Sequence, residues 1–530
     1  MWGSFGLALL ATLALAGPAA AQHFAVVDAF EAKGAESLIV VPEEWNGGLF
    51  IYAHGYSADR RTIVPYPSDL TPANIGSRLE GADRILQLPL AFGYAVGTTT
   101  YRSVGWAVAD AVKDVENIRR RFVRRYGQPG STYVWGHSEG GMVTQAVAEL
   151  ASRHYDGALP FCAPGAGARR NFNGAFDLRV AYEYVCGGVP GAQLLCNVCS
   201  GGRARCLEDT DCPAGETCAA LEPAPPVEQG LTRACTEFLL AHPEKVHEEP
   251  LGGDFVGRAL RACFGSDAST PEAAARKDLY RRATGLAPDF LNMDLFFASL
   301  AMGEVVHRRT GGRSPWGNVG VDYVAPALTP EETAAFNAGL IRVQAKAPAV
   351  RYMRRFFEPR GRTRARVLTL HALDDGLVLV QNEQKYRQAF AAAGRSDQLV
   401  QLFTPTGGHC VFSASEHLAA FSSLVGWVER GTVPTPAAAN ATCRLFEPLA
   451  GGPCGIMAAD PGEWGLRVVE RRQPGAPLAT LVCGGEPGDC PAGSECDPER
   501  HTCRAVAGRR PRPYSRAVRT GLGAIWVRRR

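Results

Sequence analysis

The stretch Tyr133-Val134-Trp135-Gly136-His137-Ser138-Glu139-Gly140-Gly141 decides the fold of this chain of 530 residues. An apolar run with high strand propensity leads into a serine flanked by glycine-containing segments, and a helical pattern starts at Met142. This order predicts a strand, a sharp turn that presents Ser138, and a helix. Gly136 and Gly140 supply the room that so tight a turn requires.

The helix after this turn directs its free N–H groups and the positive end of its dipole at any anion that forms beside Ser138. An acyl-transfer intermediate is such an anion, so Ser138 is a candidate nucleophile. The oxyanion of that intermediate needs two N–H donors. We expect one from Glu139, directly after the serine, and the other from Tyr56, after the turn His54-Gly55.

A serine hydroxyl is a weak nucleophile at neutral pH, so it requires an imidazole that removes its proton and a carboxylate that orients the imidazole. His409 lies in a glycine-rich segment after a predicted strand over 399–404. Asp374 and Asp375 follow a predicted strand over 366–370. The order serine, acid, histidine places all three groups at one edge of a parallel sheet.

Strands and helices alternate along much of the chain. Strands are predicted over 37–41, 49–53, 94–100, 158–162, 366–370 and 399–404, and helices over 75–90, 106–126, 142–154, 380–393 and 415–429. This alternation predicts an α/β fold with right-handed crossovers and a mainly parallel sheet that is flanked by helices.

The alternation stops between residues 166 and 361, which predicts a large inserted lid. Helix-like stretches over 291–307 and 330–357 and a cysteine-rich module over 186–235 lie in this segment. The predicted organisation is a signal peptide over 1–21, a core over 22–165, the lid over 166–361, the rest of the core over 362–432, a linker and cysteine-rich region over 433–503, and an Arg-rich tail over 504–530. The linker is expected at the Pro- and Ala-rich residues 434–440.

The N-terminus has the pattern of an export signal. An apolar run over 7–16 is followed by Gly17-Pro18 and by small residues up to Ala21, although no Lys or Arg precedes it. We expect cleavage near Ala21 and a secreted or periplasmic protein. No other segment approaches the length of apolar sequence that spans a membrane.

Sixteen cysteines in an exported chain favour disulfides. Residues 211–218 recur almost unchanged as 489–496, which indicates a repeated disulfide module that braces the lid and tail or contacts a polymer surface. Two metal sites are the alternatives: zinc at Cys196, Cys199, Cys206 and Cys212, or calcium at Glu208, Asp209 and Asp211.

The positive charge of the chain lies in its tail. The formal net charge is +3, and residues 504–530 hold nine arginines and no acid. Pro511 and Pro513 favour a solvated tail over a nucleic-acid patch, so no nucleic-acid partner is expected. No motif for dinucleotides, nucleoside triphosphates or catalytic zinc is present, so we expect neither a cofactor nor a metal.

The serine turn, the segment 375–378, Gly408-His409 and the turn His54-Gly55 together resemble the α/β-hydrolase superfamily. The resemblance covers about residues 24–165 and 362–432, and segments near Gly93, Tyr101 and Tyr155 are similar to secreted bacterial serine esterases and peptidases with a large lid. It implies Ser138 as nucleophile, His409 as base and Asp375 as the acid, because the family's acid usually precedes a short step into a valine such as Val378; Asp374 is the fallback.

Other residues near the motifs have weaker claims on the chemistry. We expect His371 to be a structural or pocket histidine, and His137 to face the floor of the pocket. Tannases and feruloyl esterases of the fungal type pair a cysteine before the nucleophile with one after the catalytic histidine. Cys410 fits that pattern, but His137 occupies the other position. Cys410 must therefore pair elsewhere or remain a thiol.

These patterns predict a secreted serine hydrolase that cleaves carboxylic esters of a small-molecule substrate through an acyl-enzyme. One alternative is a lidded serine exopeptidase of the prolyl or aminopeptidase kind, which acts on peptides and needs an acidic pair to hold an amino group. The other is a binding protein on a hydrolase fold that has lost turnover.

Overall fold

A computed structural model describes residues 24–57 and 84–459 with short gaps at 203, 207–208, 243–254, 266–269, 287–290 and 326, and five short strands beyond residue 469. The expected signal peptide, most of the helix expected over 75–90, Glu208 of the calcium alternative and most of the second cysteine module lie outside the described residues.

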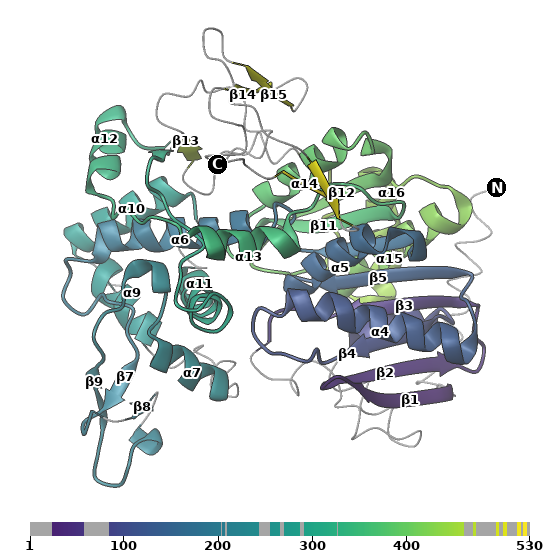
Figure 1. The fold of residues 1–530 in the computed structure, drawn as a ribbon, viewed down its shortest axis with the longest axis horizontal. Coiled ribbons are helices and arrows are strands. Elements are labelled where there is room, and N and C mark those ends of the chain that lie inside the picture. The colour runs from purple at the N-terminus through teal and green to yellow at the C-terminus, as the bar shows by residue number, and fades with distance from the viewer. Residues whose placement is uncertain are drawn as a thin grey trace.

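An eight-stranded sheet forms the core of the described chain, in the order β1-β2-β4-β3-β5-β6-β11-β12 (Figure 1). Its strands are β1 (Phe24–Ala32), β2 (Ala35–Pro42), β3 (Gly48–Ala53), β4 (Ala95–Thr99), β5 (Ser131–His137), β6 (Gly157–Phe161), β11 (Arg366–Asp374) and β12 (Leu399–Gly407). β2 pairs with β1 and with β4 in antiparallel orientation, and the pairs from β4 to β12 are parallel. The carboxyl ends of β3, β5, β6, β11 and β12 therefore share one edge of the sheet.

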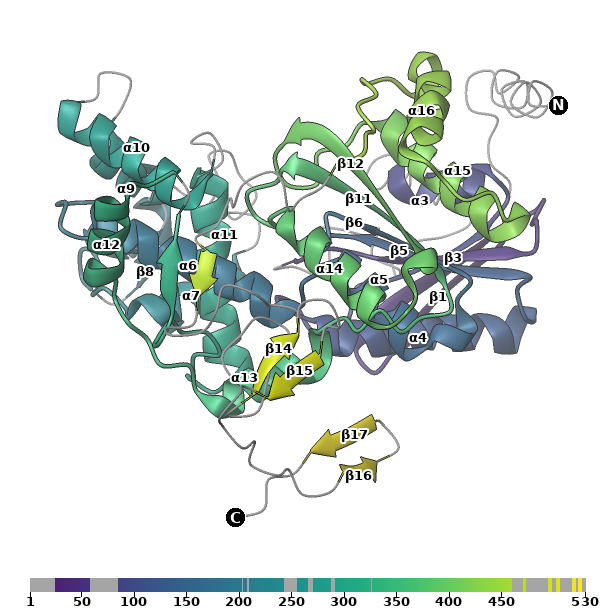
Figure 2. The same ribbon diagram turned by 90° about the horizontal axis from the view of Figure 1, so that it is seen from above.

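Helices cover both faces of this sheet (Figure 2). They are α3 (Arg84–Ala91), α4 (Val108–Tyr126), α5 (Glu139–Leu150), α14 (Gln381–Ala392), α15 (Ala414–Arg430) and α16 (Pro436–Ala450). Alternate residues of β5 divide between the two layers: Val134 packs with the α4 and α5 side chains, whereas Tyr133 and Trp135 pack with those of α3 and α15. Burial on both faces explains the continuous apolar runs of the strands.

The predicted lid lies between β6 and β11 in the chain and to one side of the sheet in both views (Figures 1 and 2). It contains α6 (Ala168–Cys186), β7 (Asn197–Cys199), β8 (Arg205–Cys206), β9 (Cys218–Leu221), α7 (Arg233–Ala241), α9 (Phe255–Phe264), α10 (Pro271–Thr284), α11 (Leu291–Glu304), the π-helical turn η6 (Val305–Arg309), β10 (Asp322–Val324), α12 (Pro330–Gly339) and α13 (Ala347–Phe357). Its apolar side chains belong to the same cluster as those of α4 and α5, so the lid packs onto the core.

Disulfides hold the cysteine-rich part of the lid together. The described chain has six: Cys162–Cys410, Cys186–Cys263, Cys196–Cys235, Cys199–Cys212, Cys206–Cys218 and Cys443–Cys454. The zinc alternative is wrong, because all four of its cysteines are bonded to other cysteines. Asp209 of the calcium alternative accepts the N–H of Cys218 at 2.7 Å and so closes a turn of the module.

Several elements differ from the sequence-based expectation. β1 was not predicted, and the helix expected over 330–357 is interrupted between α12 and α13. The linker expected over 434–440 is also wrong in part: Thr435 caps a helix at that point, and Cys443 of α16 packs with α15 side chains. Proline at the first helical position starts a helix as readily as it marks a linker. In the tail, β16 (Ala517–Thr520) pairs with β17 (Gly523–Trp526).

Among the described residues, no helix combines the length and the apolar character that crossing a membrane requires.

The turn between β5 and α5 is packed directly against the end of β3. A Cβ atom on Gly136 or on Gly140 would overlap the carbonyl oxygen of Ala53, which is backbone and cannot rotate away. Glycine is therefore required at both positions by close approach of two backbone segments.

We expect Gly140→Ala to lower the free energy of unfolding by about 3 kcal/mol or more, because the methyl group forces β3 and α5 apart. Gly130→Ala is the matched control, since the nearest atom to its Cβ would be 3.8 Å away. Denaturant unfolding with disulfides intact measures both. Equal stability of the two variants would contradict the packing argument.

Candidate active site

Ser138 occupies a strained position between β5 and α5. Its backbone has φ 58° and ψ −122°, a region that residues with a side chain rarely adopt. The Ser138 N–H donates to the carbonyl of Phe161, and its own carbonyl accepts from Met142. Strand pairing on one side and the first helical bond on the other therefore hold the serine in this conformation.

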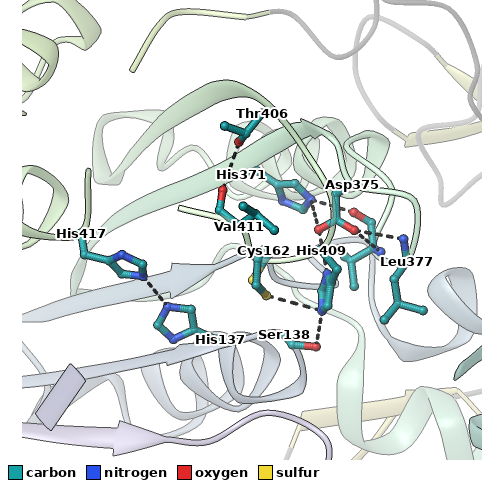
Figure 3. Close-up of a disulfide and its surroundings, with 12 residues drawn as sticks. His137, Ser138, Cys162, His371, Asp375, Leu377, Thr406, His409, Val411 and His417 are labelled. Atoms are coloured by element: carbon teal, nitrogen blue, oxygen red, sulfur yellow. Dashed lines mark hydrogen bonds and ion pairs between the residues drawn. A yellow bond between two sulfur atoms is a disulfide. The ribbon is translucent and has the colours of Figure 1, made fainter. Parts of the chain in front are cut away.

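Ser138, His409 and Asp375 form a hydrogen-bonded chain (Figure 3). Ser138 Oγ lies 2.7 Å from His409 Nε2, and His409 Nδ1 lies 2.8 Å from Asp375 Oδ2. A carboxylate only accepts, so the proton is on Nδ1, and Nε2 is free to accept from the serine hydroxyl. The structure thus brings together three residues that lie as much as 271 positions apart in the sequence.

Of the two neighbouring aspartates, Asp375 is the one that bonds His409. Asp374 ends β11, whereas Asp375 is fully buried in the loop that follows. Asp375 Oδ1 accepts the backbone N–H groups of Leu377 at 3.0 Å and Val378 at 2.8 Å. These bonds leave Oδ2 for the imidazole and fix the carboxylate in one orientation.

A disulfide fastens the histidine loop to the sheet. Cys410 follows His409 directly and is bonded to Cys162, the residue after β6. Both cysteines have positive φ, 42° at Cys162 and 59° at Cys410. Cys410 therefore pairs elsewhere, as one of the two expectations had it, and ties the loop of His409 to the strand that neighbours β5.

The turn after β3 lies against the serine. A Cβ atom on Gly55 would lie 3.5 Å from the Cβ of Ser138. Tyr101 fixes the turn, because its ring stacks on His54 with the centroids 3.8 Å apart and its hydroxyl donates to the His54 carbonyl. Tyr56, the expected second oxyanion donor, follows this turn directly, and Glu139, the expected first donor, begins α5.

A cluster of buried charge joins the start of α5 to the lid. Glu139 Oε1 accepts the N–H of Ala107 at 2.6 Å, and Glu304 of α11 accepts the N–H of Trp106 at 3.0 Å. Both carboxylates thus bind backbone N–H groups of the two residues directly before α4. Arg309 of η6 donates to Glu304 at 2.7 Å, so the lid supplies an acid and its counter-ion.

Burial changes the protonation behaviour of this cluster. It raises the pKa of Glu139 well above its usual range, and the charge of Glu304 raises it further, against the hydrogen bond from Ala107. Burial likewise raises the pKa of Glu304 despite Arg309. The pKa of Tyr56 lies well above its usual value, first through burial and then through the charges of Glu304 and Glu139. Like charges in a buried site favour the protonated forms.

His137 points away from Ser138 towards α15, whereas we expected it to face the floor of the pocket. Alternation along β5 sends its ring to the α15 side, where it stacks on Phe161 and lies 2.9 Å from His417, Nε2 to Nε2 (Figure 3). His417 Nδ1 donates to the Ser413 carbonyl, so its Nε2 accepts from His137. Burial lowers the pKa of both rings, which favours this neutral pair.

His371 is a buried structural histidine, one of the two roles expected for it. It lies on β11 behind Asp375 and bonds to the Val378 carbonyl and to Glu383 of α14. Sequence patterns did not single out Glu383, Glu304, Arg309 or Cys162. Of these four residues, only Cys162 could have been found from the sequence. It ends a predicted strand, and the segment that holds Cys410 follows another strand of the same parallel sheet.

Three groups of side chains in the described chain have spacing compatible with a metal ion, among them Cys162, His409 and Cys410. Each contains a disulfide pair, and metal binding requires thiolates that a disulfide does not provide. Those cysteines therefore hold no metal while the disulfides are intact.

No family model matches the sequence, and no curated protein is significantly similar to it. Among solved structures, feruloyl esterase B from Aspergillus oryzae is similar with 10% identity over 76% of this chain and 80% of its own, at a TM-score of 0.38. The rice cell wall degrading esterase LipA from Xanthomonas oryzae has 15% identity over 79% and 93%, at 0.35. Candida antarctica lipase A has 13% identity over 79% and 80%, at 0.38.

At these scores the similarity says nothing about substrate or mechanism, and the fold is assigned from the topology. The sheet is parallel from β4 to β12, a serine turn joins β5 to α5, and an acid and a histidine follow the last two strands. This arrangement is that of the α/β-hydrolases. The chain therefore has the α/β-hydrolase fold, with a large inserted lid between β6 and β11.

Proposed function

We propose that this protein is an exported serine hydrolase that cleaves carboxylic esters through an acyl-enzyme. Ser138 is the nucleophile, His409 the general base and Asp375 the residue that orients the base. The observation that carries the proposal is the pair of short hydrogen bonds from Ser138 Oγ to His409 Nε2 and from His409 Nδ1 to Asp375 Oδ2.

The reaction follows from these positions. Ser138 Oγ attacks the ester carbonyl carbon while His409 Nε2 takes the hydroxyl proton. The N–H groups of Glu139 and Tyr56 stabilise the oxyanion, and the dipole of α5 adds to this effect. When the carbon–oxygen bond of the ester breaks, His409 returns the proton to the leaving alcohol. Water then attacks the acyl-enzyme with His409 again as base, which releases the acid and restores Ser138.

The burial of the acidic side chains Glu139 and Glu304 favours an ester as substrate over a peptide that is bound by its amino terminus. An exopeptidase needs exposed carboxylates that grip an ammonium group. Glu139 and Glu304, which adjoin the start of α5 in the described chain, are at most 1% exposed and already accept backbone N–H groups. Their raised pKa values also favour the uncharged form, which binds an ammonium group poorly.

The remaining parts of the proposal concern location and substrate choice. Six disulfides in the described residues fit an oxidising compartment, as expected for a chain with an export signal. Glu304 and Arg309 of the lid bond to the backbone of Trp106 and Val104, just before α4 and near Glu139, and we assign substrate selection to the lid on this ground. The cysteine-rich module is part of the lid. If it contacted a polymer surface, Ser138 would remain accessible to the substrate.

We expect Ser138→Ala to reduce ester hydrolysis by about 10⁶-fold while leaving the fold intact, because alanine has no hydroxyl that can form the acyl-enzyme. Initial rates on short-chain p-nitrophenyl esters, with aminoacyl and prolyl p-nitroanilides beside them, measure the loss. Circular dichroism checks the fold. Full ester turnover by this variant would refute the assignment, and efficient anilide cleavage by the wild type would make the protein a peptidase.

Asp375→Asn should lower kcat by about 10⁴-fold at neutral pH, because an amide no longer selects the Nδ1–H tautomer of His409. Asp374→Asn is the matched control, and we expect a loss of less than about tenfold, since it is Asp375 that bonds His409 Nδ1. Steady-state kinetics on the same ester separates them. The assignment of the acid is wrong if the two variants exchange effects.

Replacing both Cys162 and Cys410 by serine should lower kcat by about 10²-fold, because the histidine loop loses its tether and small displacements of a base are costly. The matched control replaces Cys443 and Cys454, whose disulfide ties the end of α16. That variant should lose stability but keep kcat. Equal kcat losses in the two variants would show that the first bridge has no special bearing on His409.

A further inference from the structure

His371 lies in a pocket of oxygen acceptors behind Asp375. The ring is completely buried, with Nε2 2.7 Å from the Val378 carbonyl oxygen and Nδ1 3.3 Å from Glu383 Oε1. A carbonyl oxygen only accepts, so Nε2 carries a proton. The protonation state of His371 therefore depends on whether Glu383 accepts a hydrogen bond from Nδ1 or donates one to it.

Glu383 is surrounded by donors. Its Oε2 accepts the Thr369 hydroxyl at 2.7 Å and the side-chain amide of Gln401. Both bonds favour a charged carboxylate, because they stabilise negative charge on its oxygens. A charged Glu383 accepts at Oε1 as well, so Nδ1 of His371 also donates. A ring that donates from both nitrogens is an imidazolium.

We propose that His371 is a permanently protonated, buried imidazolium that Glu383 holds beside Asp375, where it acts as a positioning residue for the proposed acid. The inference rests on the proposed role of Asp375. His371 Nε2 lies 3.7 Å from Asp375 Oδ2, the same oxygen that faces His409 (Figure 3). Two rings thus flank one carboxylate oxygen, and the inner ring never enters the substrate's space.

In the described chain, the ion-pair partners of His371 are the acids Glu383 and Asp375, which both favour its protonated form. From α14, Glu383 faces the ring, and Tyr386 beside it stays neutral because burial and then the charges of Glu149 and Glu383 raise its pKa well above the usual value. From β12, Gln401 and Phe403 are uncharged. From the loop after β11 comes Asp375. Burial alone would lower the pKa of His371, but the hydrogen bond and charge of Glu383 and the charge of Asp375 raise it.

A cation at this distance has a defined effect on the reaction. A cation beside this carboxylate favours its charged form and disfavours a further positive charge on the other ring that contacts it. His371 and Glu383 would extend activity to lower pH without touching the substrate.

Nitrogen NMR of the full-length protein with labelled histidine tests the charge directly. His371 is assigned by the signal that His371→Asn removes. We expect both ring nitrogens to carry protons at pH 7, where an ordinary histidine is mostly neutral. A neutral ring at pH 7 overturns the proposal. This result does not depend on turnover, so it stands apart from the Ser138→Ala test of the proposed function.

The pH dependence of kcat/KM tests the effect on the reaction. Glu383→Gln removes the negative charge that favours a protonated His371, so we expect the acid limb of the profile to move to higher pH by about one unit. His371→Asn should shift it equally, and the double variant no further. Thr369→Val is the matched control: it removes one bond to Glu383, keeps both charges and should leave the limb in place. An unmoved limb in Glu383→Gln, or an equal shift in Thr369→Val, contradicts the proposal.

Discussion

The close approach of α5 to the end of β3 is the constraint on which the rest of the structure depends. Gly136 and Gly140 let the carbonyl oxygen of Ala53 lie where any side chain would collide with it. This contact brings the turn after β3 against Ser138 and forces the serine into its strained conformation. It thereby also sets where a base, an acid and N–H donors must lie to act on the same atom.

Buried ionisable side chains around this turn are arranged in two separate groups. On one side, Glu139 and Glu304 accept backbone N–H groups of the two residues before α4, and Arg309 donates to Glu304, so the lid and the start of α5 meet at this segment. On the other side, His371 and Glu383 lie behind Asp375. In each group, backbone or side-chain hydrogen bonds compensate much of the cost of burying charge, which is otherwise prohibitive.

The strands and helices of the core were predictable because apolar runs and helical periodicity are local properties of the sequence. Apolar runs of strand length and helical periodicity located seven of the eight strands, from β2 to β12, and most of the core helices. β1 was not predicted because Asp28 and Glu31 interrupt its apolar sequence; its pairing with β2 at the edge of the sheet stabilises it. The helix α16 was not predicted because its first residues resemble a linker. Its packing against α15 stabilises the helix.

The sequence by itself determined the serine turn, the order of serine, acid and histidine, and the presence of disulfides, since spacing and residue type suffice for each. Only the tertiary structure decided that Asp375 bonds His409, that Cys410 pairs with Cys162, and that His137 turns toward His417. It also decided which acids meet around α4 and which lie behind Asp375. These outcomes depend on which side chains the sheet register and the lid bring within a few ångströms of one another. Contacts between residues that are hundreds of positions apart produce no periodic pattern in the sequence.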